Sequence, residues 1–293
     1  MKKIVMLLFA TVVMCALLAA CGDQPEPTAI PTTQSTTAES QAHVHAFAKW
    51  KNLFNPSVDG YGKEQLICGV CKEVIEERYI PPTGSLGLNY EVTSRLLKTC
   101  VITGIGSCTD TRLYIGSYID GYKVTGIAEA AFVGNLHLTE VVILDGLTTI
   151  GDSAFSCCTN LSKLTIADSV ETIELGAFMI CGLTEVKMGS GIRNMAERVF
   201  NGCWRLADIV IPEGITYIEN EMFDDCFGLK SVTIPVSVTK IEYGVFASCV
   251  NLQDIYFAGT MAQWEAIEKE EIRLNPSQGC TIHCTDGDLE YQE

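Results

Sequence analysis

The stretch LADIVIPEGITYIENEMFDDC, from Leu206 to Cys226, decides the fold because its pattern recurs along the chain. Six segments align from a leading leucine, and the successive spacings are 23, 22, 23, 23 and 23 residues. The leading residues are Leu138, Leu161, Leu183, Leu206, Leu229 and Leu252. A fixed period of this size is typical of solenoids, in which each repeat packs only on its neighbours.

Each repeat carries the same apolar columns. Across the copies, apolar strand residues such as Ile209 and Ile211 alternate with mostly polar residues, which predicts a short strand with one buried face. Ile218, Phe223 and Cys226 belong to three further columns, that is, to positions where each copy carries a residue of the same kind. Segments of the type Gly151–Phe155 predict one capped helical turn, too short for a full helix. One such unit buries too little apolar surface to offset its ordering entropy, so stacked parallel strands are expected.

The repeat resembles the leucine-rich repeats of BspA-like bacterial surface proteins, which read Leu-x-x-Leu-x-Ile-Pro-x-x-Val-x-x-Ile-x-x-x-Ala-Phe-x-x-Cys. The match covers about Tyr90 to Tyr291. The resemblance implies a leucine-rich-repeat solenoid of parallel β-strands with short helical turns, on the surface of a bacterial cell. We expect an N-terminal cap and first coil over 86–137, repeats over 138–257 and a C-terminal cap over 258–293.

Both ends of such a stack need covers. Thr260 and Gln263 have capping-box spacing, which predicts a short helix from about Met261 to Lys269. Its Trp264 should cover the last coil together with Ile267. At the other end, residues 88–114 should pair as strands over the first coil.

The first twenty residues predict an export signal. Lys2 and Lys3 precede an apolar run over 4–18 that is short for a membrane span. Leu18-Ala19-Ala20-Cys21 resembles the lipobox of bacterial lipoproteins, which implies cleavage of 1–20 and a lipid on Cys21. The alternatives are an ordinary signal peptide or a membrane-anchor helix. Residues 21–42 are mostly Pro, Thr, Ser, Gln and Ala, which predicts a disordered tether.

Residues 43–85 predict a small zinc-ribbon-like module. Cys68 and Cys71 form a Cys-x-x-Cys pair, and His43 and His45 precede it by about 23 residues, which suits a structural zinc ion. The segment also resembles small modules of surface proteins from gut anaerobes, in which a histidine often stands where this chain has Ser85. A metal-free module or a redox Cys-x-x-Cys pair are the alternatives. A closed four-ligand zinc site would be structural, not catalytic.

The fourteen cysteines divide by position. Cys15 and Cys21 belong to the export signal, and the five column cysteines are expected to be inert thiols in the core. A disulfide between Cys100 and Cys108 is left open. Cys280 and Cys284 lie four residues apart on one expected strand, which is too far for them to bond to each other.

Charge and motif content limit the function. Twenty Lys and Arg residues face 36 Asp and Glu residues, so the net charge is −16, or −18 without Lys2 and Lys3. This balance argues against nucleic acid as a partner. The chain has four histidines and lacks His-Glu-x-x-His, Gly-x-Ser-x-Gly and phosphate-loop motifs.

We therefore expect a monomeric, non-enzymatic surface protein, exported and attached to the membrane through its lipid only, that binds a host or bacterial surface protein or glycan. The outward positions of the repeat strands are its predicted binding surface: Glu140, Lys163, Lys187, Asp208, Lys230 and Tyr256. A structural spacer of the cell envelope is the alternative. A zinc-dependent hydrolase is a remote one.

Overall fold

A computed structural model of the chain describes residues 49–54, 62–67, 72, 74–80, 84–274 and 279–290. The export signal, the tether and Cys21 lie outside the described residues, as do the predicted zinc ligands His43, His45, Cys68 and Cys71. In the described part, no helix has the length and apolar character needed to cross a membrane.

The segment assigned to the small module contains a three-stranded antiparallel sheet. Its strands are β1 (Lys49–Phe54), β2 (Gly62–Ile67) and β3 (Val74–Ile80), in that order across the sheet. The register places Lys49 opposite Ile67 and Gly62 opposite Ile80.

An antiparallel hairpin begins the solenoid, as the sequence predicts. It is formed by β4 (Asn89–Ser94) and β5 (Thr99–Gly104). Strand β5 then pairs in parallel with β8 (Tyr122–Ile127), whose other neighbours include the short antiparallel strand β7 (Tyr118–Ile119). The hairpin thus supplies the edge on which the repeats stack.

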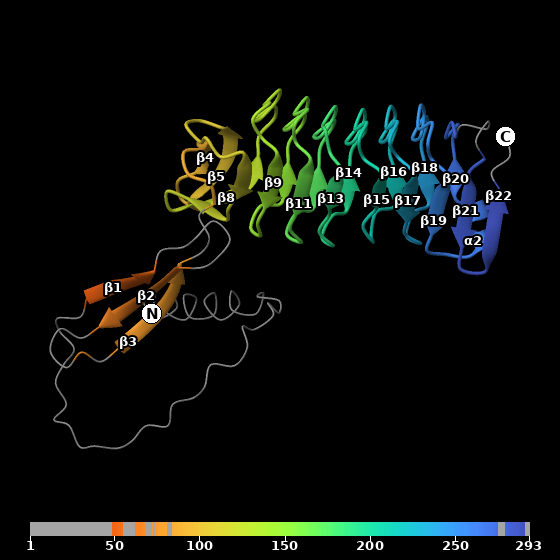
Figure 1. Ribbon diagram of the computed structural model, residues 1–293. Coiled ribbons are helices and arrows are strands. Elements are labelled where there is room, and N and C mark those ends of the chain that lie inside the picture. The colour runs from red at the N-terminus through yellow and green to blue at the C-terminus, as the bar shows by residue number, and fades with distance from the viewer. Residues whose placement is uncertain are drawn as a thin grey trace, which may run out of the picture. The chain divides into compact units, whose positions relative to one another are not determined.

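Two rows of parallel strands run along the solenoid (Figure 1). The first row is β6 (Arg112–Ile115), β9 (Glu140–Ile143), β11 (Lys163–Ile166), β13 (Glu185–Lys187), β15 (Asp208–Val210), β17 (Ser231–Ile234), β19 (Asp254–Phe257) and β21 (Thr281–Cys284), closed by antiparallel β22 (Gly287–Glu290). The second row follows β8 with β10 (Thr149–Ile150), β12 (Thr172–Ile173), β14 (Asn194–Met195), β16 (Tyr217–Ile218), β18 (Lys240–Ile241) and β20 (Glu268–Lys269). The register pairs equivalent repeat positions, such as Leu164 with Val141, so the predicted parallel solenoid is confirmed.

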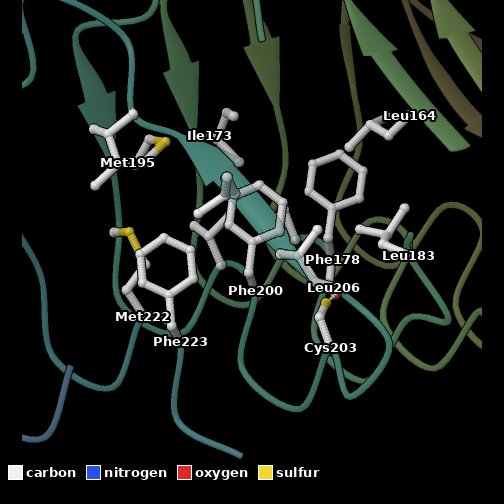
Figure 2. Close-up of a cluster of buried hydrophobic side chains, with 14 of the residues drawn as sticks. Leu164, Ile173, Phe178, Leu183, Met195, Phe200, Cys203, Leu206, Met222 and Phe223 are labelled. Atoms are coloured by element: carbon white, nitrogen blue, oxygen red, sulfur yellow. Dashed lines mark hydrogen bonds between the residues drawn. The ribbon is translucent and has the colours of Figure 1, made fainter. Parts of the chain in front are cut away.

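The interior contains a continuous stack of phenylalanine rings. Six rings, from Phe132 to Phe246, lie 4.8 to 5.9 Å apart between centroids and nearly parallel. Figure 2 shows three of them, Phe178, Phe200 and Phe223, among buried leucine and methionine side chains. All five rings of the repeats proper are fully buried, which confirms the predicted core column.

The cysteine column packs beside the rings. Each of its five thiols donates a hydrogen bond to the phenylalanine carbonyl of the preceding coil, at 3.0 to 3.3 Å. The ten cysteines of the described residues are all free. The disulfide left open between Cys100 and Cys108 is therefore not formed, and the column is made of buried thiols as expected.

The expected helical turns before each column cysteine are wrong. The segment from Gly151 to Cys158 forms successive tight turns, and Ser153 and Cys157 adopt left-handed backbone conformations (φ +52° and +61°). Successive N–H groups donate alternately to a carbonyl within the turn and to a carbonyl of the next coil. Ala154 N–H donates to Gly151 O, and Phe155 N–H donates to Ala177 O. A helical turn would direct these donors along its own axis, whereas this arrangement joins neighbouring coils.

Both strand rows are interrupted between the third and fourth repeats. Within the described residues, β13 does not pair with β15, nor β14 with β16. The 22-residue spacing separates Leu161 from Leu183, so the second repeat is the short one, and the third carries Gly189–Gly191 where others have Pro or Asp. The turns remain joined, because Arg198 N–H donates to Asn220 O and Phe200 N–H to Met222 O, each at 3.1 Å. We call this interruption the seam.

The C-terminal helix is shorter than predicted. Helix α2 spans Met261–Ala266 and begins with the predicted capping box between Thr260 and Gln263. The helix ends at Ile267, whose backbone is extended, and residues 268–269 form β20 instead. Pairing of β20 with β18 covers an otherwise open sheet edge, so strand replaces helix at Lys269. Trp264 and Ile267 are buried, as expected of a cap.

Candidate binding surface of the repeat array

The outward side chains of the first strand row form one surface, which we call the strand face. Five of the six predicted surface residues lie on its strands: Glu140, Lys163, Lys187, Asp208 and Tyr256. Lys230 is exposed but directly precedes β17, so it lies beside the row. Each strand presents two outward positions, and equivalent positions of neighbouring strands are in register, as Lys163 is with Glu140 and Thr233 with Tyr256. The outward side chains therefore form two columns across the strands.

The N-terminal half of the strand face is charged and paired within itself. Arg112 Nε lies 3.1 Å from Glu140 Oε2, and its guanidinium stacks over the Tyr114 ring at 4.8 Å. Glu185 contacts Lys187 at 2.8 Å and Lys163 at 3.6 Å, and these two ammonium groups lower the pKa of the Glu185 carboxyl. Exposed pairs of this kind add little stability, so their main effect is to neutralise charge on this half.

The C-terminal half is more apolar. Val210, Thr233, Tyr256 and His283 occupy one column, each in register with the next. Val210 is 62% exposed and Tyr256 45% exposed. The Tyr256 ring stacks on the His283 ring, with centroids 4.8 Å apart and planes at 18°. We call these four residues the apolar column.

Acidic groups border the apolar column. Asp208 accepts a hydrogen bond from the Ser231 hydroxyl at 2.6 Å. The His283 ring bridges two carboxylates, with Nε2 2.9 Å from Asp254 and Nδ1 3.0 Å from Asp288. These contacts, Asp254 first, raise the pKa of His283 above its usual value. The two carboxylates thereby hold the His283 ring in a fixed orientation against the Tyr256 ring.

The arrangement is suited to binding. An exposed aromatic residue supplies contact area at small entropic cost, and the neighbouring carboxylates and hydroxyls can accept hydrogen bonds. Two of the column thiols are poor nucleophiles, since burial raises the pKa of Cys203 and of Cys249 to about 12. Among the described residues, no three His, Cys, Asp or Glu side chains converge as a metal site would require.

Two hollows lie away from the strand face. One, of about 360 Å³, is lined by residues that include Cys108, Asp110 and His137. The other, of about 170 Å³, lies at the seam between Met195 and Tyr217. The second hollow lies where β14 and β16, adjacent strands of the second row, do not pair.

The sequence does not single out Val210 or His283 as binding residues. Val210 stands at an outward strand position, but an isolated valine in a strand carries no signal of its own. His283 lies in the closing strand, where the leucine pattern has ended. One signal could have identified it. His283 follows Thr281 by two residues, as Tyr256 follows Asp254, so the two residues occupy equivalent positions on neighbouring strands.

The fold and the repeat pattern together define a leucine-rich-repeat solenoid. Residues 125–255 match the BspA type leucine rich repeat region in six copies. The repeat array of this chain is therefore similar to the BspA-type leucine-rich-repeat family. No curated protein matches the sequence.

Solved structures of leucine-rich-repeat proteins are similar to the chain. The T. pallidum protein TpLRR is 29% identical, with a TM-score of 0.55 over 58% of this chain and 78% of that one. A protein from Eubacterium ventriosum is 26% identical (TM-score 0.42, 59% of this chain, 42% of that one). One from Bacteroides ovatus is 21% identical (TM-score 0.42, 59% and 54%). The chain thus spans about half the length of the latter two.

Proposed function

We propose that this chain is an exported, lipid-anchored bacterial surface protein that binds a protein or glycan partner through the C-terminal half of its strand face. The observation that carries the proposal is the apolar column, in which Val210 and Tyr256 stay exposed on a rigid sheet. A solvated sheet face has no need of an exposed tyrosine held on a histidine by stacking. Recognition surfaces are enriched in such rigid aromatic side chains.

The charge pattern favours the same half of the face. The N-terminal half satisfies its ions internally, through Arg112 with Glu140 and Glu185 with two lysines. The C-terminal half leaves acceptor oxygens of Asp208 and Asp254 beside exposed apolar surface. A partner that offers hydroxyl or N–H donors next to an apolar patch, such as a glycan or a polar peptide, fits that combination.

Binding can be tested with a soluble form in which a tag replaces residues 1–21. The probes are a glycan array and a panel of purified host and bacterial surface proteins. Tyr256→Ala should reduce binding at least tenfold, as expected of an interface anchor. Tyr217→Ala is the matched control, because Tyr217 is 52% exposed on the second strand row. Equal losses for the two variants would contradict the strand face as the binding surface, and no binding by the unchanged protein would favour the spacer role.

Lipid anchoring rests on the lipobox-like sequence that ends at Cys21. Metabolic labelling with a fatty acid should mark the unchanged chain in a bacterial host and leave Cys21→Ala unlabelled. Retention of the label in the variant would contradict the anchor and leave the binding surface untouched. The two parts of the proposal can therefore fail separately.

A structural zinc ion in the 43–85 module remains part of the proposal. Its ligands would be His43, His45, Cys68 and Cys71, and the site would stabilise a module too small for a large core. Metal analysis of the purified chain should find one zinc ion that Cys68→Ser loses. A tightly held ion without an exchangeable water would also count against the hydrolase alternative.

A further inference from the structure

The tip of the β4–β5 hairpin presents two leucines to solvent. Leu96 is 92% exposed and Leu97 73% exposed, although both belong to the residue type most often found in cores. Arg95 and Lys98 flank them and are exposed as well. The tip therefore combines adjacent apolar side chains with a cation on each side.

The turn holds this conformation by specific contacts. Leu97 N–H donates to Ser94 Oγ at 3.1 Å, and Lys98 adopts a left-handed backbone (φ +50°). Thr93 and Thr99 link their hydroxyls at 2.8 Å across the base of the turn. These contacts fix the backbone of the turn that carries the two leucines.

The neighbouring strand adds a third cation. Lys123 is exposed, lies opposite Thr99, and donates its N–H to Lys98 O at 2.7 Å. Tyr118, 37% exposed, pairs with Lys123 on the other side. The next turn carries the carboxylate of Asp120, which accepts a hydrogen bond from the Tyr90 hydroxyl at 3.0 Å.

Charge at this tip is opposite to that of the whole molecule. Two exposed cations, Arg95 and Lys98, flank the leucines, and a third, Lys123, lies on the neighbouring strand, in a chain of net charge −16. Glu91 is the acidic residue on β4, and it lies beyond Ser94 from the tip. Leucines with a tyrosine and flanking cations form the composition that partitions into the interface of an anionic bilayer.

We propose that the β4–β5 tip inserts its two leucines into an anionic lipid surface while Arg95, Lys98 and Lys123 contact the headgroups. A bilayer fits better than a protein groove because the pair of leucines is small and lies at the tip of a hairpin, and because the neighbouring cations are opposite in charge to phosphate headgroups. The inference does not depend on the strand face or on a lipid at Cys21. An insertion of this kind would fix the N-terminal end of the solenoid at the membrane.

The test reads insertion locally, so that other membrane contacts of the full chain do not matter. Leu96→Trp is mixed with vesicles of phosphatidylcholine and phosphatidylglycerol whose acyl chains carry bromine, a short-range quencher of indole fluorescence. We expect quenching beyond that of the unchanged chain, which already contains Trp50, Trp204 and Trp264. Val236→Trp, at a side chain 46% exposed in a distant repeat, is the matched control and should show none.

Charge reversal separates the lipid from other partners. Arg95→Glu with Lys98→Glu in the Leu96→Trp background should raise the vesicle concentration needed for half-maximal quenching by a factor of about thirty or more. Vesicles of phosphatidylcholine alone should quench little. Equal quenching in the Leu96→Trp and Val236→Trp variants would overturn the proposal. So would a blue shift in the emission of the Leu96→Trp variant that grows with protein concentration without vesicles, because a second copy would then cover the tip.

Discussion

Replacing Phe200 by alanine should divide the solenoid into two separately melting halves. Phe200 is fully buried, and its ring stacks on Phe178 and Phe223 at 5.9 Å. It belongs to the last coil before the seam, so its contact with Phe223 crosses the interruption in both strand rows. The turns and the ring stack join the halves there.

The cost follows from the buried volume and the lost ring contacts. A buried phenylalanine truncated to alanine costs about 3–5 kcal/mol. Each stacked pair adds about 0.5–1.5 kcal/mol, so the upper end of that range, about 5 kcal/mol, is expected. A repeat array is stabilised by nearest-neighbour interfaces, and weakening one interface below its neighbours uncouples what lies on either side.

Urea denaturation followed by far-ultraviolet circular dichroism, with hydrogen exchange by mass spectrometry, would measure the effect. Phe155→Ala is the matched control, because Phe155 is also fully buried and stacked on both sides but lies where the strand rows are continuous. The control should lose similar stability in one transition. Phe200→Ala should show two transitions, with exchange protection lost first in one half. A single transition for both variants would refute the role assigned to the seam.

Three further predictions concern single side chains. Cys203, whose burial raises its pKa to about 12, should resist alkylation in the native protein, whereas half-buried Cys157 reacts; equal labelling of both would contradict the buried column. The pKa of His283 is raised by Asp254 and Asp288, so the stabilisation it gives is complete below its unfolded value of about 6.5 and is lost as pH rises through the native pKa. A proton NMR titration should show this pKa fall in Asp254→Asn; an unchanged value would contradict the assigned contact. Thr260→Ala removes the helix cap and should cost about 1 kcal/mol in thermal unfolding, while a neutral effect would mean that Asp286, which accepts from Met261 N–H, suffices.

The repeat architecture was predictable because each apolar column occurs several times. A single alternation in Leu206–Val210 is ambiguous, but six aligned copies exclude any other period. The capping box at Thr260 was predictable too, since it depends on two residues three apart. These features are local or repeated, and both kinds can be read from a linear sequence.

The turns and the end of helix α2 were not predictable in the same way. Whether Ser153 adopts a left-handed conformation depends on the carbonyl of Leu175, one coil further on, that receives its N–H. Lys269 joins a strand because β18 offers an open edge. In both places a carbonyl acceptor on another coil outweighs local helical preference.

The sequence by itself determined the solenoid, its period, the buried columns and the strand positions that face outward, because these follow from spacing alone. Only the tertiary structure decided which outward residues form a surface. Register brought Val210, Tyr256 and His283 into one column from two repeats and the C-terminal cap, and it paired the charges of the other half with one another. The tertiary structure also held Leu96 and Leu97 in solvent, since a turn fixed by Ser94 and by contact with β8 leaves them no core to enter.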